Sequence, residues 1–485
     1  MLECPLMTVS PLSVVIAYLV LTTLLGIALG RRAKTARDWA VAGGSMGTFM
    51  LAAAIAGTRI GGAGIYGVAG DVITGGVWNL VWYAASTFLA LAIVGLWFAV
   101  PYRRLGLQTV GEAFTRRFGS RRGQALTSLC VQTEYLIVNV IEVYVTAALL
   151  RFMTGISVPV ATLCAVAVLV SYTAFGGLWG AAYTNLVHCA VIVLGLGAVV
   201  ILGTSSFGGW EAVTRAVATR LALAGRDEGA FWSIAGQGWA PVIAMIFSAA
   251  IHTPAASIYA NFSTAARTER QLSATFLLAG LGASVMPALA GIVGILTLAR
   301  YGAGRGLSGY ATITTFATET SPWLGGLAIA AILAAVVSTG GPILLSSATL
   351  FVRDWLPARV TATPEVTLRA YRIATVVIGV LSGFLSLLVV KSGDLASESA
   401  PLRLCHGRAA RYRSLLPYLL AAHHRGQCPF GDGPRLRCEH RFLRPGAWGT
   451  VGLRPLVREH PGASSGDSSR FSGHALVRGR GGEAV

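Results

Sequence analysis

The chain alternates long apolar runs with short polar segments that carry arginine. A membrane-spanning helix needs about 20 predominantly apolar residues, and ten stretches approach or exceed that length. Because open sheet edges cannot face lipid, all ten are predicted to be helices. They cover residues 11–30, 46–70, 77–100, 125–149, 157–175, 182–203, 239–261, 275–299, 323–350 and 370–390.

The composition supports this assignment. The 485 residues are 54% hydrophobic and only 12% charged, with a mean hydropathy of +0.66, whereas a soluble globular protein usually has about 25% charged residues. The seven cysteines include no CxxC pair, so neither a disulfide framework nor a zinc site is predicted. We therefore expect an all-α polytopic protein in a lipid bilayer, with no cofactor.

The positive charges predict an orientation in the membrane. The formal net charge is +18, and cytoplasmic loops of membrane proteins carry an excess of Lys and Arg. If the N-terminus is outside, the inside loops hold most of these residues, so we expect this topology in the plasma membrane and no nucleic-acid partner. The inside residues are Arg31, Arg32, Lys34, Arg37, Arg103, Arg104, Arg116, Arg117, Arg121, Arg122, Arg267, Arg270, Arg353, Arg359, Arg369 and Arg372, and the outside residues are Arg151, Arg215, Arg220, Arg226, Arg300 and Arg305.

The character of the chain changes after Lys391. Residues 392–485 hold 14 Arg against 7 Asp plus Glu, and their one apolar run, residues 415–422, is too short to span a membrane. Two interpretations stay open: a disordered basic tail, or an out-of-frame translation. We favour the second, because ten spans would put this tail outside. The out-of-frame interpretation predicts that another reading frame beyond codon 391 encodes further apolar spans. Reading the other two frames of that region tests this prediction.

Glycines crowd the second apolar stretch, around residues 52–70. Each costs a helix about 1 kcal/mol relative to alanine, and Arg59 adds about 2.5–3.5 kcal/mol if it lies near the bilayer centre. One interpretation is the interrupted helix of a transporter binding site, lining a wet cavity. The other is glycine packing against a neighbouring helix, with Arg59 in a structural ion pair. The glycines are Gly57, Gly61, Gly62, Gly64 and Gly67.

Two adjacent hydroxyl residues mark a second unusual stretch, residues 331–350. Ser338 and Thr339 are followed at once by Gly340, Gly341 and Pro342. Sodium is a hard cation that prefers oxygen ligands, and a helix weakened at Gly-Gly-Pro would also offer free carbonyl oxygens. The alternative is that both hydroxyls only bond back to their own helix.

Four segments resemble the sodium:solute symporter family, which includes the sodium–proline, sodium–pantothenate and sodium–glucose carriers. They fall in order, at plausible spacing, between residue 11 and about residue 391. Two positions depart from the family: Asn185 stands where Asp is common, and Arg59 where some members carry an acid. The segments are GTRIGGAGIYGVAG (57–70), SYTAFGGLWGAAYTNLVH (171–188), STAARTERQ (263–271) and AAVVSTGGPILLSSATLFVRD (334–354).

The resemblance implies a LeuT-like inverted repeat of five plus five helices, with one extra N-terminal span. Residues 46–70 and 239–261 would begin the two repeats, and His252-Thr253-Pro254 interrupts the second of these stretches as a broken helix would. The fifth helix of the second repeat should follow Lys391, where the irregular tail begins. The second repeat is therefore predicted to be incomplete.

The resemblance also implies a sodium site, built from the carbonyls of Gly57, Ile60 and Ala335 and the hydroxyls of Ser338 and Thr339. The last three of these share a helix face, at i, i+3 and i+4. Ionisable residues within a membrane are functional candidates, and for Arg59 a structural pair with Glu134 is an equal alternative. His252 is interpreted as a proton site or, preferably, as a satisfied core histidine. The substrate-binding candidates are Arg59, Gly61, Gly62, Gln132, Glu134, Glu142 and His252.

The predicted function is secondary active transport: sodium-coupled symport of a small polar organic solute by alternating access. One alternative keeps the fold but couples transport to protons through Glu134 or His252. Another is a membrane sensor or structural protein that has lost transport. An enzyme is not expected, because no Ser/His/Asp, di-acid or metal-ligand cluster is found at a membrane face.

Overall fold

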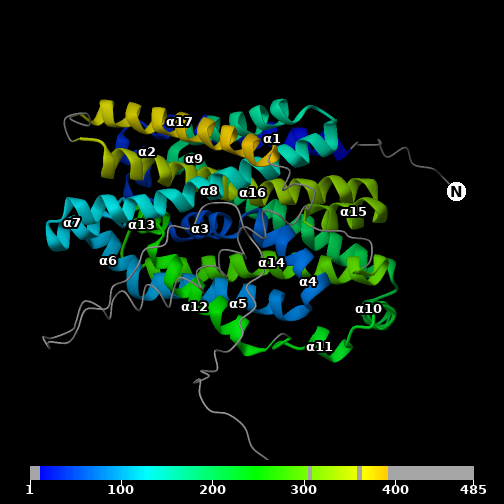
Figure 1. Ribbon diagram of the computed structural model, residues 1–485. Helices are drawn as coiled ribbons and strands as arrows, with labels where there is room; N and C mark the ends of the chain where they lie inside the picture. The colour runs from blue at the N-terminus through cyan, green and yellow to red at the C-terminus, as the bar shows by residue number, and fades with distance from the viewer. Residues whose placement is uncertain (1–10, 237, 304–308, 358–362, 392–485) are drawn as a thin grey trace, which may run out of the picture. The chain divides into compact units, whose positions relative to one another are not determined.

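The computed structural model describes residues 11–236, 238–303, 309–357 and 363–391 (Figure 1). The tail from residue 392 onward, and with it the predicted position of a fifth helix in the second repeat, lies outside the described residues. Within them the chain is helical, and the long helices run roughly alongside one another (Figure 1). The helices are α1 (Pro11–Leu29), η1 (Gly30–Arg32), α2 (Ala36–Val41), η2 (Ala42–Gly44), α3 (Thr48–Gly62), η3 (Ala63–Gly67), α4 (Val68–Gly75), α5 (Val77–Ile93), η4 (Val94–Phe98), α6 (Ala99–Arg104), α7 (Glu112–Phe118), α8 (Arg121–Thr154), α9 (Val158–Ser206), α10 (Trp210–Leu223), α11 (Glu228–Trp232), α12 (Trp239–Ala255), α13 (Ser257–Ala265), α14 (Leu272–Tyr301), α15 (Tyr310–Thr320), α16 (Pro322–Leu350), η6 (Phe351–Trp355) and α17 (Pro364–Lys391).

The apolar helices account for the predicted spans. Among the described residues, eight helical segments are long and apolar enough to cross a membrane, and the bent pair α12–α13 forms a ninth. Helix α9 has 49 residues, which is about 73 Å at 1.5 Å per residue and far more than one crossing of a hydrocarbon core of about 30 Å needs. It holds two predicted spans, 157–175 and 182–203, joined at a kink at Gly177.

The predicted interruption of the second span is confirmed. Within α3, Gly61 has φ 55° and ψ 175°, outside the helical region. A positive φ costs glycine little because it has no Cβ, which explains why the break falls in the glycine-rich stretch. A π-helical turn, η3, and then α4 follow the break.

The predicted break in the seventh span is also present, slightly later than the sequence suggested. Helices α12 and α13 meet at 58°, and Ala256 between them is extended, with φ −76° and ψ 115°. Pro254 lies in the last turn of α12 and has no N–H to continue the hydrogen-bond ladder, so the chain leaves the helix two residues beyond it. Broken helices therefore stand first in each predicted repeat, and α1 precedes both.

The helix stays continuous at Gly340–Pro342, and the carbonyl expected to be free there has a partner from another helix. Helix α16 runs without interruption from Pro322 to Leu350, with Pro342 inside it. A proline removes the hydrogen bond to the carbonyl four residues earlier, which here is that of Ser338. The Asn185 side chain on α9 supplies the missing donor, since its Nδ2 lies 3.1 Å from the Ser338 oxygen.

Helix α16 is the centre of the packing. Most of its side chains are buried, and it contacts α3, α8, α9, α15 and α17. Outside the predicted spans, α10 is the short surface helix that the sequence suggested between residues 204 and 238. It buries Val213, Val217 and Leu221, which lie four residues apart on one face.

Candidate functional site

The break in α3 lies directly against α16. The Ser338 hydroxyl donates to the carbonyl oxygens of Gly57 and Ala335, each at 2.9 Å. The Thr339 hydroxyl lies 3.3 Å from the Gly57 oxygen and 3.1 Å from the Thr58 oxygen. Four of the five predicted sodium ligands are therefore gathered in one buried cluster of oxygens.

Ile60 is the fifth predicted ligand. Its carbonyl accepts from the Ala63 N–H just beyond the break, and the described contacts do not tie it to α16. Both hydroxyls reach across to α3, so the alternative that they bond only to their own helix does not hold. What remains of that alternative is the Ser338 bond to Ala335, which lies within α16.

Asn185 joins the three helices around this oxygen cluster. Its Nδ2 lies 3.0 Å from the Ala54 oxygen and 3.2 Å from the Thr58 hydroxyl, besides the bond to Ser338. The sequence marked Asn185 only as a departure from the Thr-Asp pair of the family. Its structural role was missed because it depends on the carbonyl that Pro342 leaves unpaired, which no local pattern reveals.

Glu142 on α8 is the one ionisable candidate that reaches the break. It is only 4% exposed, and its carboxylate accepts from the Gly62 N–H. A Cβ built on Gly61 would lie 2.8 Å from Glu142 Oε1 and 3.4 Å from Thr339 Oγ1. Glu142, Gly61 and Gly62 are thus brought together beside the oxygen cluster, where α3, α8 and α16 meet (Figure 1).

Glu134 lies elsewhere on α8. Its Oε1 is 2.6 Å from His252 Nε2 on α12, and both side chains are partly exposed. The described contacts pair Glu134 with His252 and show no ion pair between Glu134 and Arg59, so they do not support the alternative of a structural Arg59–Glu134 pair. Spacing along one helix could not show this, because the partner is chosen by how α12 packs.

The remaining candidates are separated from Glu142. Gln132 Nε2 donates to the Ser347 hydroxyl at 2.6 Å, just over two turns of α16 beyond Thr339. Arg59 is half-buried, and its Nε has no hydrogen-bond partner among the described residues. The seven substrate-binding candidates therefore fall into different environments: Glu142 with Gly61 and Gly62, Glu134 with His252, Gln132 on Ser347, and Arg59.

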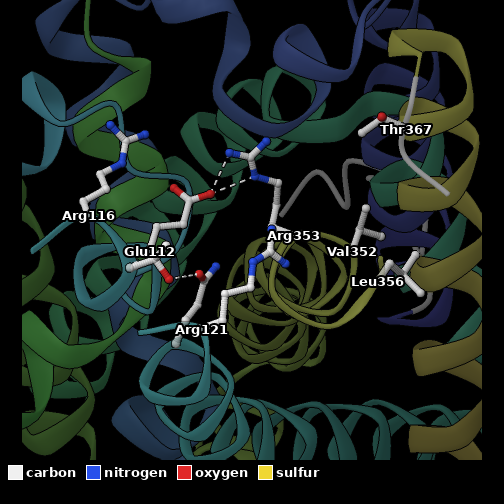
Figure 2. Close-up of a pocket in the computed structure, with 9 residues that line it drawn as sticks. Glu112, Arg116, Arg121, Val352, Arg353, Leu356 and Thr367 are labelled. Carbon is white, nitrogen blue, oxygen red and sulfur yellow. Dashed lines mark hydrogen bonds and ion pairs between the residues drawn. The ribbon is translucent and has the colours of Figure 1, made fainter. Parts of the chain in front are cut away.

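A second polar network lies where α16 continues into η6. Figure 2 shows the Arg353 guanidinium facing the Glu112 carboxylate, with Nη2 at 2.6 Å and Nε at 2.8 Å from Oε1. Asp354 accepts from Thr109 at 2.9 Å and from Gln124 at 2.6 Å. These contacts tie η6 to the α7 region and to α8 beside a cavity of about 310 Å³. The sequence treated Arg353 only as a loop charge, because its partner is 241 residues away.

Glu112→Gln should weaken this network measurably. The Glu112 carboxylate is buried and receives the Arg353 guanidinium and the Gln108 N–H. Hydrogen bonds to charged groups contribute about 1.5–3 kcal/mol, so we expect a loss of about that size, read as a lower unfolding temperature of the purified protein. Glu269→Gln is the matched control, because its pair with Arg104 is largely exposed and should contribute less than about 1 kcal/mol. Equal effects of the two variants would contradict a structural role for the buried pair.

Comparison with known proteins assigns the chain to a family. A model of the sodium:solute symporter family matches residues 39–397. A high-affinity choline transporter of Drosophila melanogaster is 31% identical over 192 residues, which are 38% of this chain and 30% of that protein. Solute carrier family 5 member 4A of Mus musculus is 25% identical over 207 residues, 42% of this chain and 31% of that protein. The chain spans about a third of the length of these two relatives.

Solved structures share the fold. The chain resembles a Na+-coupled sialic acid symporter in its substrate-bound outward-open state, with a TM-score of 0.67 and 20% identity over 79% of this chain and 83% of that one. It also resembles a nucleobase-cation-symport-1 family transporter with a TM-score of 0.51 and 18% identity, over 70% of this chain and 71% of that one. The broken helices and apolar spans described above agree with this fold. The chain belongs to the sodium:solute symporter family, a family of multi-pass membrane transporters rather than enzymes.

Proposed function

We propose that this chain is a secondary active transporter that couples sodium entry to the uptake of a small polar organic solute. The proposal rests on one contact between two helices. The hydroxyls of Ser338 and Thr339 on α16 reach the buried backbone carbonyls of α3 just before its break. A buried cluster of neutral oxygens suits a hard monovalent cation. It lacks a formal charge, so it would bind sodium weakly enough to release it on the other side.

The inward sodium concentration gradient would drive uptake. The solute would bind beside the same break, near Gly61, Gly62 and Glu142, because discontinuous helices of this fold place their free backbone groups in a cavity at mid-membrane. The two broken helices, α3 and α12–α13, supply the matching half-sites of an alternating-access cycle. Replacing sodium by choline at fixed pH should abolish uptake.

Proton coupling is the second candidate function. It is favoured by one contact, the 2.6 Å pair between Glu134 on α8 and His252 on α12, since a histidine can act as a proton shuttle. Uptake that persists in choline but collapses when the proton gradient is dissipated would support it and reject sodium coupling.

The proposed orientation places the N-terminus outside the plasma membrane, and cysteine labelling tests it. In a chain with its native cysteines replaced, Arg117→Cys and Arg267→Cys should resist an impermeant thiol reagent added to intact cells, and both should label after permeabilisation. Arg215→Cys on α10 is the control that should label from outside. All three positions are exposed in the structure, so access depends on sidedness alone. Labelling of residue 117 or 267 from outside would reject the orientation.

A further inference from the structure

Glu142 is a buried carboxylate whose hydrogen-bonding capacity is not fully used among the described residues. It lies in the middle of α8, 4% exposed, and its Oε2 is buried with no hydrogen-bond partner among the described residues. The one backbone donor it receives is the Gly62 N–H at the break in α3. An ionised carboxylate is costly to bury without a counter-charge, so some cation or proton must neutralise it.

No basic side chain meets this need among the described neighbours of Glu142. Tyr172 faces it from α9 and donates its own hydroxyl to the Val337 carbonyl. Tyr66 approaches from η3, Leu169 from α9, and Thr339 and Gly340 from α16. Arg59, two residues before Gly61, interacts electrostatically with Tyr259, and no described contact joins it to Glu142. Any neutralising charge must therefore arrive with a ligand or a proton.

The oxygen cluster proposed to bind sodium lies within reach of this carboxylate. Glu142 Oε1 and Thr339 Oγ1 both lie within 3.4 Å of the point where a Cβ on Gly61 would stand, so the two oxygens are at most about 6 Å apart. At that separation an opposite charge strongly favours the ionised carboxylate. A sodium ion held by Ser338 and Thr339 would therefore act on Glu142 directly.

We propose that Glu142 is a proton site linked to the sodium site. With no sodium bound, a proton neutralises the carboxylate. When sodium binds to the carbonyls and hydroxyls of α3 and α16, the O–H bond of the protonated Glu142 carboxyl group breaks. The proton then leaves to the aqueous side from which sodium entered. The buried region gains one positive charge and loses another, so its net charge is unchanged. This inference rests on the proposed sodium site, and it assigns to Glu142 a role distinct from solute binding.

The test is the pH dependence of sodium binding to the purified full-length chain. The unfolding temperature is measured against sodium concentration over a series of pH values, with choline keeping the ionic strength constant. In the wild type, the sodium concentration that raises the unfolding temperature by a fixed amount should fall as pH rises. The fall should be up to about tenfold per pH unit for one proton exchanged per ion. For Glu142→Gln this sodium concentration should not depend on pH, and Glu142→Asp should keep the pH dependence.

A second measurement needs no variant. Sodium added to weakly buffered wild-type protein with an indicator dye should release close to one proton per sodium bound, and potassium should release none. Glu142→Gln that retains the wild-type pH dependence, or sodium binding without proton release, would overturn the proposal while leaving the sodium site intact. Absence of any sodium-dependent stabilisation would instead reject the sodium site, and this inference with it.

Discussion

Thr339→Ala and Ser338→Ala should each raise the sodium concentration needed to stabilise the protein, on the order of 10- to 100-fold if the loss resembles that of a supporting group in other metal sites. Each substitution removes one hydroxyl oxygen from the cluster between α3 and α16. Alanine has the highest helix propensity, so α16 should stay folded. The readout is the unfolding temperature of the purified full-length chain at increasing sodium concentration.

Thr349→Ala is the matched control for these variants. Thr349 is buried in the same helix, but among the described residues its hydroxyl bonds only to the Leu345 carbonyl one turn earlier. Removing this hydroxyl should leave unchanged the sodium concentration needed to stabilise the protein, even if the overall stability falls slightly. If Thr339→Ala and Thr349→Ala show the same sodium dependence, the Thr339 hydroxyl is not a ligand and serves only to join α16 to α3.

Gly177→Ala should be strongly destabilising. Gly177 has φ 54° and ψ −150° at the kink of α9, a region that side chains reach only at a cost of about 1–3 kcal/mol. The added Cβ would also lie 2.6 Å from the backbone oxygen of Trp39, where α2 packs against α9. We expect a total loss of several kcal/mol, comparable with the stability of many domains.

Gly197→Ala tests this explanation within the same helix. Nothing lies within 4 Å of a Cβ built on Gly197, so alanine there should be neutral or stabilise the helix by up to about 1 kcal/mol. Expression in the membrane and the unfolding temperature provide the comparison. A Gly177 variant as stable as the Gly197 variant would show that the kink tolerates a side chain, and that the two halves of α9 are held apart by something other than this residue.

Local composition predicted the apolar spans, and the glycine-rich stretch and Pro254 indicated the two broken helices together with the family resemblance. Glycine at Gly61 and proline at Pro254 act on the backbone through their own geometry, so their effects can be read without knowing any partner. Helix spacing placed Ala335, Ser338 and Thr339 on one face for the same reason, and the structure brings that face to Gly57.

Partners far away along the chain could not be predicted. Pro342 was expected to leave a free carbonyl in α16, yet Asn185 on α9 pairs with that carbonyl, which belongs to Ser338. A pair between Glu134 and Arg59 was one of two alternatives, whereas the packing of α12 brings His252 to Glu134. Arg353 was counted as a loop charge, although Glu112 holds it in a buried pair. Each of these cases concerns a tertiary contact that propensity does not encode.

Binding of radiolabelled sodium to the purified full-length chain tests the central claim most directly. The account predicts saturable binding that unlabelled sodium displaces and that equal concentrations of potassium or choline do not. Ser338→Ala and Thr339→Ala should lower this binding, and Thr349→Ala should not. Bound radioactivity no higher than in protein-free samples would contradict the presence of a sodium site between α3 and α16. Displacement of the labelled sodium by potassium as efficiently as by unlabelled sodium would contradict it too.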